Sequence, residues 1–363
     1  MDRSIILEPA VLKKVLRTPE KALEHIHLIY TTENQLSIAR KKIEDQFIYL
    51  KKGKPIVTKK DLERIKKLVI PPAWQNVKIA HLDNSHLQAI GRDKKHRKQY
   101  RYHPLWTKVR NQTKFYNMLD FGQKLPLIRK RIDQDLDQNT WNKTKVLALV
   151  IRLMEETHIR IGNEQYAKRN KTYGLSTLRT RHVKTYKEKK KFEFTGKKGK
   201  KHSITLKNKK LIKLVNKCEE IPGWELFQYY DSDGKKHAID SQMINEYIHS
   251  LAGEYHTAKD FRTWSGSIIF FESLLEQGIT SDAKEIKQNL IAAYDTVAKN
   301  LGNTRAVCKK YYVHPYLAAS YEDHSIAKHF KIANQETSSA HFTSSEKAVM
   351  NLLKNYKPQI LIE

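Results

Sequence analysis

The chain has 363 residues, 39% of them apolar, so it is long and apolar enough for a folded core and two domains. Lysine and arginine outnumber aspartate and glutamate by 68 to 39, and this formal net charge of +29 makes a polyanion such as nucleic acid the expected partner. The apolar runs are shorter than the roughly 18 residues of a membrane span and no secretory signal is visible, so we expect a soluble intracellular protein.

Residues 1 to about 110 are predicted to form a mainly antiparallel β domain. Short runs of β-branched and aromatic residues alternate with Gly, Pro, Asn and Asp, which end strands. A helix interrupts them, because Leu62 and Ile65 recur at helical spacing after a cap at Asp61, and Pro71 and Pro72 end it. The predicted strands are residues 27–30, 46–50, 55–58, 77–80, 87–90 and 99–102.

From about residue 111 the apolar pattern changes to the period of a helix. Long helices are predicted around residues 146–154 and 286–301, and an amphipathic helix at 344–356 is expected to dock on the same domain. The second domain, residues 111–363, is therefore predicted to be mainly helical.

One β-hairpin is predicted inside this helical domain. Residues 191–195 and 202–206 alternate in polarity on either side of a lysine-rich turn. The fold class is therefore predicted to be α+β, with a mainly antiparallel β domain followed by a mainly α domain that carries a small hairpin or sheet.

Basic residues gather in separate stretches. Residues 181–201 contain ten Lys or Arg against two Glu, and residues 91–102 interleave cations with aromatic residues. A solvated loop is the ordinary interpretation of either run, but with so large a global charge excess they favour a surface that follows a phosphate backbone. The period of two puts Tyr100 and Tyr102 on one strand face, where they either meet nucleic acid or pack in the sheet.

Motifs for cofactor chemistry are missing from the sequence. Cys218 and Cys308 are too few for a disulfide framework, and the histidines form no HExxH zinc pattern. There is no phosphate-binding GxxxxGKS/T loop, and the Asp231–Gly234 segment is interpreted as a solvated turn and not as a calcium loop. We therefore expect no metal and no other cofactor.

The stretch 301–315 is a basic, helix-like segment that contains two adjacent tyrosines, Tyr311 and Tyr312. A phenol, with a pKa of about 10, attacks a phosphodiester only if other groups supply cations for the phosphate and an acid for the leaving oxygen. Arginine suits the first task because its fork matches phosphate oxygens.

Candidates for these tasks occur elsewhere in the chain. Arg160 follows an apolar helix and precedes Gly162, which permits a close backbone approach, and Arg262 lies between aromatic residues. Lysine suits the second task because neighbouring cations lower its pKa, and Lys197 lies at the hairpin tip among other lysines. Taken singly, each of these residues is more often an ordinary surface or ion-pair residue.

Together they resemble a known family. Arg160-Ile161-Gly162, Phe194-Thr195-Gly196-Lys197, the stretch 259–264 (KDFRTW) and the stretch from Gly302 to Tyr312 occur in the order found in type IB DNA topoisomerases, closest to the compact poxvirus and bacterial form. Pro72-Ala73-Trp74 and residues 91–102 resemble the DNA-clamping domain of that form. The resemblance extends from about residue 68 to residue 315.

The resemblance implies roles for individual residues. Tyr312 would be the nucleophile that forms a 3′-phosphotyrosine, Arg160 and Arg262 would bind the scissile phosphate, and Lys197 would be the general acid, with Lys198 and Lys200 as close alternatives. Asn303 stands where poxvirus members have histidine and would keep a hydrogen bond to phosphate without its charge. The implied DNA contacts are Gln99, Tyr100, Tyr102, Tyr166 and Lys259.

The family further implies what the protein does. It would relax supercoiled duplex DNA as a monomeric, C-shaped clamp with the tyrosine recombinase/topoisomerase IB catalytic fold, using neither ATP nor metal. We expect a cytoplasmic, nucleoid-associated protein if the source is bacterial, or a location in a virion or virus factory if it is viral. The alternatives are a tyrosine recombinase, which typically has a His-x-x-Arg motif where this chain has Lys259, and a non-catalytic basic DNA-binding protein.

Overall fold

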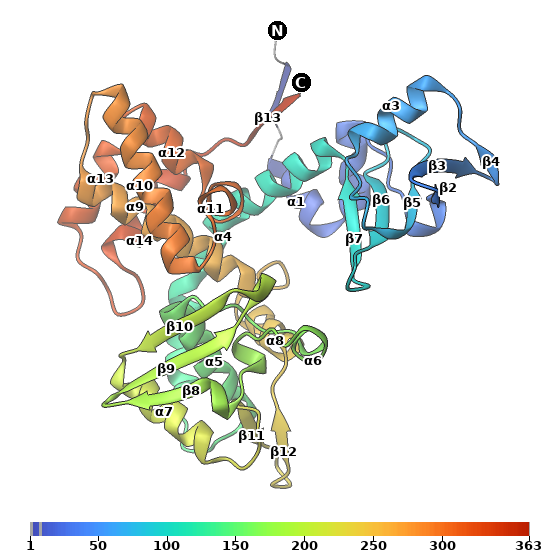
Figure 1. Cartoon of the computed structure of the whole chain (residues 1–363). Helices are drawn as coiled ribbons and strands as arrows, with labels where there is room; N and C mark the ends of the chain where they lie inside the picture. The colour runs from blue at the N-terminus through green and yellow to red at the C-terminus, as the bar shows by residue number, and fades with distance from the viewer. Residues whose placement is uncertain (1–2, 7–8, 363) are drawn as a thin grey trace. The chain divides into compact units, whose positions relative to one another are not determined.

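The computed structural model of the protein describes residues 3–6 and 9–362 (Figure 1). The chain divides into two compact units, one made of Met1–Tyr116 with Lys357–Glu363 and the other of Asn117–Tyr356. The long helix α4 (Pro104–Leu136) contains both the predicted change of pattern near residue 110 and the division between Tyr116 and Asn117.

The first unit is organised around a six-stranded antiparallel sheet with the strand order β4-β3-β2-β5-β6-β7. Ile38, Val77 and Ile79 of the sheet pack against Ile65 of α3 and form a small core. The elements of this unit are β1 (Arg3–Ile6), α1 (Pro9–Arg17), α2 (Pro19–Ala22), β2 (Ile38–Ile43), β3 (Gln46–Lys51), β4 (Lys54–Pro55), α3 (Lys59–Lys67), β5 (Gln75–Ile79), β6 (Leu87–Arg92), β7 (Lys98–Tyr102) and β13 (Gln359–Ile362), which pairs with β1.

Most strands predicted for this unit are confirmed, but the segment 27–30 is not a strand, and only Pro55 of the segment 55–58 lies in one, β4. His27 has a positive φ of 54°, and Ile29 makes only an isolated bridge to Ser85. Strand β2 was missed because its alternation is hidden by Arg and Lys. The helix α3 begins after Thr58, whose hydroxyl bonds the Asp61 carboxylate at 2.5 Å, so the cap lies three positions before the predicted one.

The second unit is mainly helical and has one large apolar core. Helix α5 is buried along most of its length, and Val146, Leu149 and Val150 have no exposed surface. Its helices are α5 (Lys143–Thr157), α6 (Glu164–Asn170), α7 (Lys209–Glu220), α8 (Ser241–Ala252), α9 (Ala258–Gln277), α10 (Ala283–Leu301), α11 (Arg305–Tyr311), α12 (Pro315–Glu322), α13 (Ala327–Gln335) and α14 (Ser344–Leu353). The predicted final helix is confirmed as α14, which buries Val349 and Leu352 in this core.

The predicted hairpin is confirmed as β9 (Lys189–Thr195) and β10 (Lys201–Leu206), joined by the short 3-10 turn Lys197–Gly199. A third strand that was not predicted, β8 (Val183–Tyr186), pairs with β9 on its other side. A separate short strand pair, β11 (Gln228–Tyr230) and β12 (Lys236–Ala238), completes the unit. The predicted α+β class is thus confirmed, with a small sheet inside the helical part.

Among the described residues, no helix is long and apolar enough to cross a membrane. These described residues also include no cluster of three or more His, Cys, Asp or Glu side chains that could hold a metal ion. Both cysteines are buried and unpaired. The Asp231 carboxylate accepts the backbone N–H groups of Asp233 and Lys235, so this segment is a turn, as predicted.

Candidate active site

Arg262 lies on the second turn of α9, which begins with a capping box between Thr257 and Asp260. Its side chain is only 4% exposed, and its guanidinium donates to the backbone oxygens of His158 and Leu301, the latter at 2.9 Å. These carbonyls stand at the C-terminal ends of α5 and α10, where helices leave acceptors unused and carry partial negative charge. The buried cation is therefore held by backbone and not by the flanking aromatic residues.

Arg160 is positioned by the chain reversal after α5. His158 ends that helix in the left-handed conformation with φ of 54°, and the Arg160 carbonyl accepts the N–H of Leu175 at 2.9 Å. A β-carbon on Gly174 would lie 2.4 Å from the Arg160 oxygen and 2.7 Å from the Gly162 nitrogen. The predicted close backbone approach at Gly162 is thus confirmed, and with the Leu175 bond it fixes the backbone of Arg160.

Asn303 meets the Arg160 side chain. Gly302 ends α10 with φ of 62°, and Asn303 follows it in the turn before α11. The Asn303 Oδ1 atom accepts a 2.5 Å hydrogen bond from Arg160 Nη2, while its amide Nδ2 donates to the Leu301 oxygen at 3.3 Å. Residues 143 positions apart in sequence are thereby joined at one turn. The stretch 301–315, predicted as one helix-like segment, is in fact the end of α10, this turn, α11 and the start of α12.

Tyr312 directly follows α11 and is held against α9. The Ser267 hydroxyl donates to the backbone oxygen of Tyr312 at 3.4 Å and accepts the backbone N–H of His314 at 3.0 Å. A β-carbon on Gly266 would lie 2.9 Å from the same oxygen, so only glycine lets the two segments approach this closely. Helix α9 therefore carries Arg262 and also fixes the backbone of Tyr312.

The electrostatics of Tyr312 follow from this placement. The Arg262 guanidinium carbon lies 5.1 Å from the Tyr312 ring centroid. Burial raises the pKa of Tyr312, but the charges of Arg262 and Arg160 and hydrogen bonds to both outweigh it, so the pKa falls below its ordinary value. Tyr311, by contrast, is 40% exposed and has Lys310 Nζ 5.5 Å from its ring.

Mutual repulsion is visible in the pKa of Arg262. Burial first, and the nearby Arg160 second, lower it to about 10. At neutral pH both guanidiniums remain charged. Two neighbouring positive charges in a partly buried site strongly favour the binding of an anion.

Lys197 is not part of this group. It is exposed at the tip between β9 and β10, and in the described part of the chain no hydrogen bond or ion pair joins it to Arg160, Arg262, Asn303 or Tyr312. Lys200, in the same turn, lies nearer, because a β-carbon on Gly302 would be 3.9 Å from its Nζ atom.

The predicted DNA contacts divide between the two units. On β7 of the first unit, Tyr100 and Tyr102 are 43% and 37% exposed on one face and their rings stack at 5.9 Å, while Gln99 is less exposed and bonds Asp93 at 3.0 Å. The predicted strand alternation is confirmed. In the second unit, Tyr166 on α6 is 48% exposed and Lys259 is exposed on the first turn of α9.

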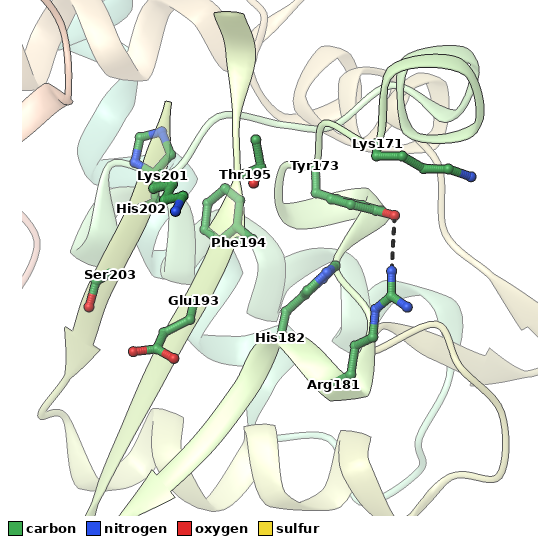
Figure 2. Close-up of a pocket in the computed structure, with 10 residues that line it drawn as sticks. All are labelled: Lys171, Tyr173, Arg181, His182, Glu193, Phe194, Thr195, Lys201, His202 and Ser203. Atoms are coloured by element: carbon green, nitrogen blue, oxygen red, sulfur yellow. Dashed lines mark hydrogen bonds between the residues drawn. The ribbon is translucent and has the colours of Figure 1, made fainter. Parts of the chain in front are cut away.

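Sequence reasoning missed a hollow of about 540 Å³ beside the hairpin (Figure 2). Lys171, Arg181 and Lys201 are among the residues that line it, and Arg181 donates to the Tyr173 hydroxyl at 3.3 Å. The basic run 181–201 predicted positive charge here, but only the pairing of β8, β9 and β10 places these cations around one depression. His202 lines the same hollow and also adjoins Gly302 in the turn between α10 and α11.

The sequence is similar to known proteins over most of its length. Residues 95–339 match the family model of the eukaryotic DNA topoisomerase I catalytic core, and residues 46–93 match that of the bacterial DNA topoisomerase IB N-terminal domain. DNA topoisomerase 1B of Acanthamoeba polyphaga mimivirus is 35% identical over 90% of this chain and 97% of its own length. DNA topoisomerase 1 of Rabbit fibroma virus is 24% identical over 63% of this chain and 70% of its own length. DNA topoisomerase 1B of Vaccinia virus (strain Copenhagen) is 22% identical over 62% of this chain and 69% of its own length.

Proposed function

The chain belongs to the type IB DNA topoisomerase family, and we propose from this premise that it relaxes supercoiled duplex DNA by nicking and rejoining one strand. The observation that carries the proposal is the Tyr312 hydroxyl beside Arg160 and Arg262. A phenol next to fixed cations is suited to attack a phosphodiester, because the cations bind the non-bridging oxygens on which negative charge builds.

In the proposed cleavage step, Arg160 and Arg262 bind the scissile phosphate and the Asn303 amide adds an uncharged hydrogen bond. The Tyr312 phenol oxygen attacks phosphorus and releases its proton to solvent, and the new bond forms a 3′-phosphotyrosine as the bond from phosphorus to the 5′ oxygen breaks. The leaving oxygen keeps the electron pair and takes a proton from Lys197.

Rejoining is the reverse reaction. The phosphotyrosine ester conserves the free energy of the broken bond, so the 5′ hydroxyl attacks phosphorus after the free end has rotated, and the Tyr312 oxygen leaves and takes up a proton from solvent. The lysine accepts the proton that it gave in the first step. Because no bond energy is lost, the proposed cycle needs no ATP, and because arginine charges stabilise the phosphate, it is proposed to need no metal.

The partner of this site is proposed to be duplex DNA, bound by a monomer. The exposed side chains of Tyr100, Tyr102, Tyr166 and Lys259, with Gln99, are the proposed contacts, and the net charge of +29 supports them. The viral origin of the relatives named above supports a virus-associated DNA enzyme, and a virion or virus factory is its proposed location.

Relaxation of supercoiled plasmid in EDTA and without ATP tests this function. We expect the wild-type protein to relax the plasmid and to form a covalent adduct with a 3′ DNA end, and Tyr312→Phe to do neither while still binding DNA. Tyr311→Phe is the matched control, since it removes the neighbouring hydroxyl and is expected to keep activity. Relaxation by Tyr312→Phe, or its loss in Tyr311→Phe, would contradict the assignment of the nucleophile.

A further inference from the structure

The hairpin tip meets the catalytic turn at the side chain of His202. This residue lies on β10, where its ring stacks on Phe194 of β9 with the centroids 5.0 Å apart and the planes inclined by 14° (Figure 2). A β-carbon on Gly196, at the base of the tip, would lie 2.7 Å from the Cδ2 and Nε2 atoms of His202. A β-carbon on Gly302 would lie 2.9 Å from its Cε1 atom. The imidazole therefore fills the space between the two glycines.

Both glycines stand next to residues of the proposed reaction. Gly196 precedes Lys197, and Gly302 precedes Asn303. The tip itself is closed by local bonds, from the Gly196 N–H to the Lys200 oxygen at 2.7 Å and from the Gly199 N–H to the Gly196 oxygen at 3.1 Å. Such bonds fix the shape of the tip but not its position relative to Asn303. Packing of the imidazole against Gly302 supplies that position.

The surroundings of His202 favour a packing role over a role as a charge. Burial, and then the positive charges of Arg160, Lys200 and Arg262, lower the pKa of the imidazole below its ordinary value. The ring is accordingly neutral at neutral pH, and it can lie among cations without adding to their repulsion.

We propose that His202 is a positioning residue, which holds the lysine-bearing tip in register with Asn303 and Tyr312 so that the acid reaches the leaving 5′ oxygen. The inference rests on the proposed function and adds a residue to it. A small displacement of a reacting group lowers the rate strongly, so even a loosely held tip would slow proton transfer to the leaving group.

The first experiment compares His202→Ala on two substrates in single-turnover cleavage. With an ordinary phosphodiester we expect cleavage to slow on the order of 10-fold to 100-fold, with DNA affinity unchanged. With sulfur in place of the leaving 5′ oxygen, the group departs as a thiolate and needs no proton, so the variant is expected to cleave at nearly the wild-type rate. Equal slowing on both substrates would overturn the proposal, because the damage would then lie outside the acid step.

His237→Ala is the control for loss of an imidazole. His237 also stacks on an aromatic ring, that of Tyr229 at 5.5 Å, and it lies in the strand pair of β11 and β12 in the same unit. The His237→Ala variant is expected to cleave both substrates at the wild-type rate. A thermal melt of each variant shows that the compared proteins are folded.

A second variant tests the same contact from the other side. The backbone of Gly196, with φ of −98° and ψ of −164°, suits any residue, so Gly196→Ala adds only a methyl group that collides with the imidazole. We expect it to slow cleavage of the ordinary substrate, and we expect the double variant with His202→Ala to be no slower than His202→Ala alone. Independent, multiplying effects would contradict a direct contact.

Hydrogen exchange at the tip separates this inference from the proposed function. Loss of the imidazole is expected to speed exchange of the Gly196 and Gly199 amides in the free protein, while β8 keeps its protection. If the wild-type protein cleaves neither substrate, the proposed function fails, and faster exchange in His202→Ala would still support the packing role. Unchanged exchange at the tip would overturn that role even in an active enzyme.

Discussion

The arginine pair and the hairpin tip differ in how the fold holds them. Arg262 is 4% exposed and bonded to the carbonyl ends of two helices, whereas Lys197 is exposed in a short turn whose next residue, Lys198, has a positive φ of 64°. Rigid placement suits a group that must stabilise charge without reorganising, and a turn suits a group that must reach an atom only once DNA is present. Under the proposed mechanism, the two phosphate-binding arginines are thus held in place before DNA binds, whereas the proton donor has to be brought to the leaving oxygen.

Replacing the lysines of the hairpin tip gives the largest expected effect and tests the proposed proton donor. We expect Lys197→Ala to slow single-turnover cleavage by about 10² to 10⁴, the usual range for loss of a general acid, with little change in DNA affinity. Sulfur in place of the 5′ oxygen is expected to restore the rate.

Lys200→Ala is the matched variant, because Lys200 Nζ lies nearer Gly302 in the free protein. We expect it to slow cleavage less than Lys197→Ala and to gain less from the sulfur substrate. The reverse order would assign the acid to Lys200 and would show that the free tip already places its donor.

Arg262→Lys tests the rigidly held arginine pair. A lysine keeps the positive charge, but its donors lie on a single nitrogen, which cannot replace Nη1 at the His158 carbonyl and Nη2 at the Leu301 carbonyl and also bind a phosphate. We expect cleavage to fall by about 10² to 10³, as for loss of a transition-state donor, and no recovery with the sulfur substrate.

The same substitution is expected to lower stability. One buried carbonyl left without a donor costs about 1 to 3 kcal/mol, so the melting temperature should fall by several degrees. Lys259→Arg, an exposed change on the same helix, is the control for stability. An unchanged melting temperature in Arg262→Lys would show that the hydrogen bonds from the Arg262 guanidinium to the two backbone carbonyls do not contribute to stability.

The smallest expected effect is a shift in the titration of Tyr312. Because Arg262 and Arg160 stabilise its phenolate more than burial disfavours it, its pKa lies below the ordinary value of about 10. The phenolate should therefore form at a lower pH than that of an exposed tyrosine, and Arg160→Gln should move the transition upward.

The ultraviolet difference spectrum between the wild type and Tyr312→Phe measures this titration. The same difference taken with Tyr311→Phe gives the exposed comparison. If Tyr312 ionised at or above the pH of Tyr311, the arginine pair would not act on the resting hydroxyl.

Much of the fold could be predicted from local pattern. The alternation in β9 and β10, the apolar period of α5 and α10 and the face of α14 all reflect burial on one side of a regular element. The failures have local causes as well. Positive φ at His27 prevents the expected strand, and the left-handed Gly302 interrupts the expected helix-like segment 301–315.

The candidate residues and their order could be read from the sequence, since Arg160, Lys197, Arg262, Asn303 and Tyr312 lie in motifs that match a family. Which of these residues contact one another depends on the packing of the helices. The Arg160 bond to Asn303 and the Tyr312 contact with Arg262 join residues far apart in the chain, and Lys197 stays outside that group. Periodicity describes which side of one helix or strand is buried, whereas these contacts depend on how α5, α9 and α10 pack, and close approaches at Gly174, Gly266 and Gly302 set that packing.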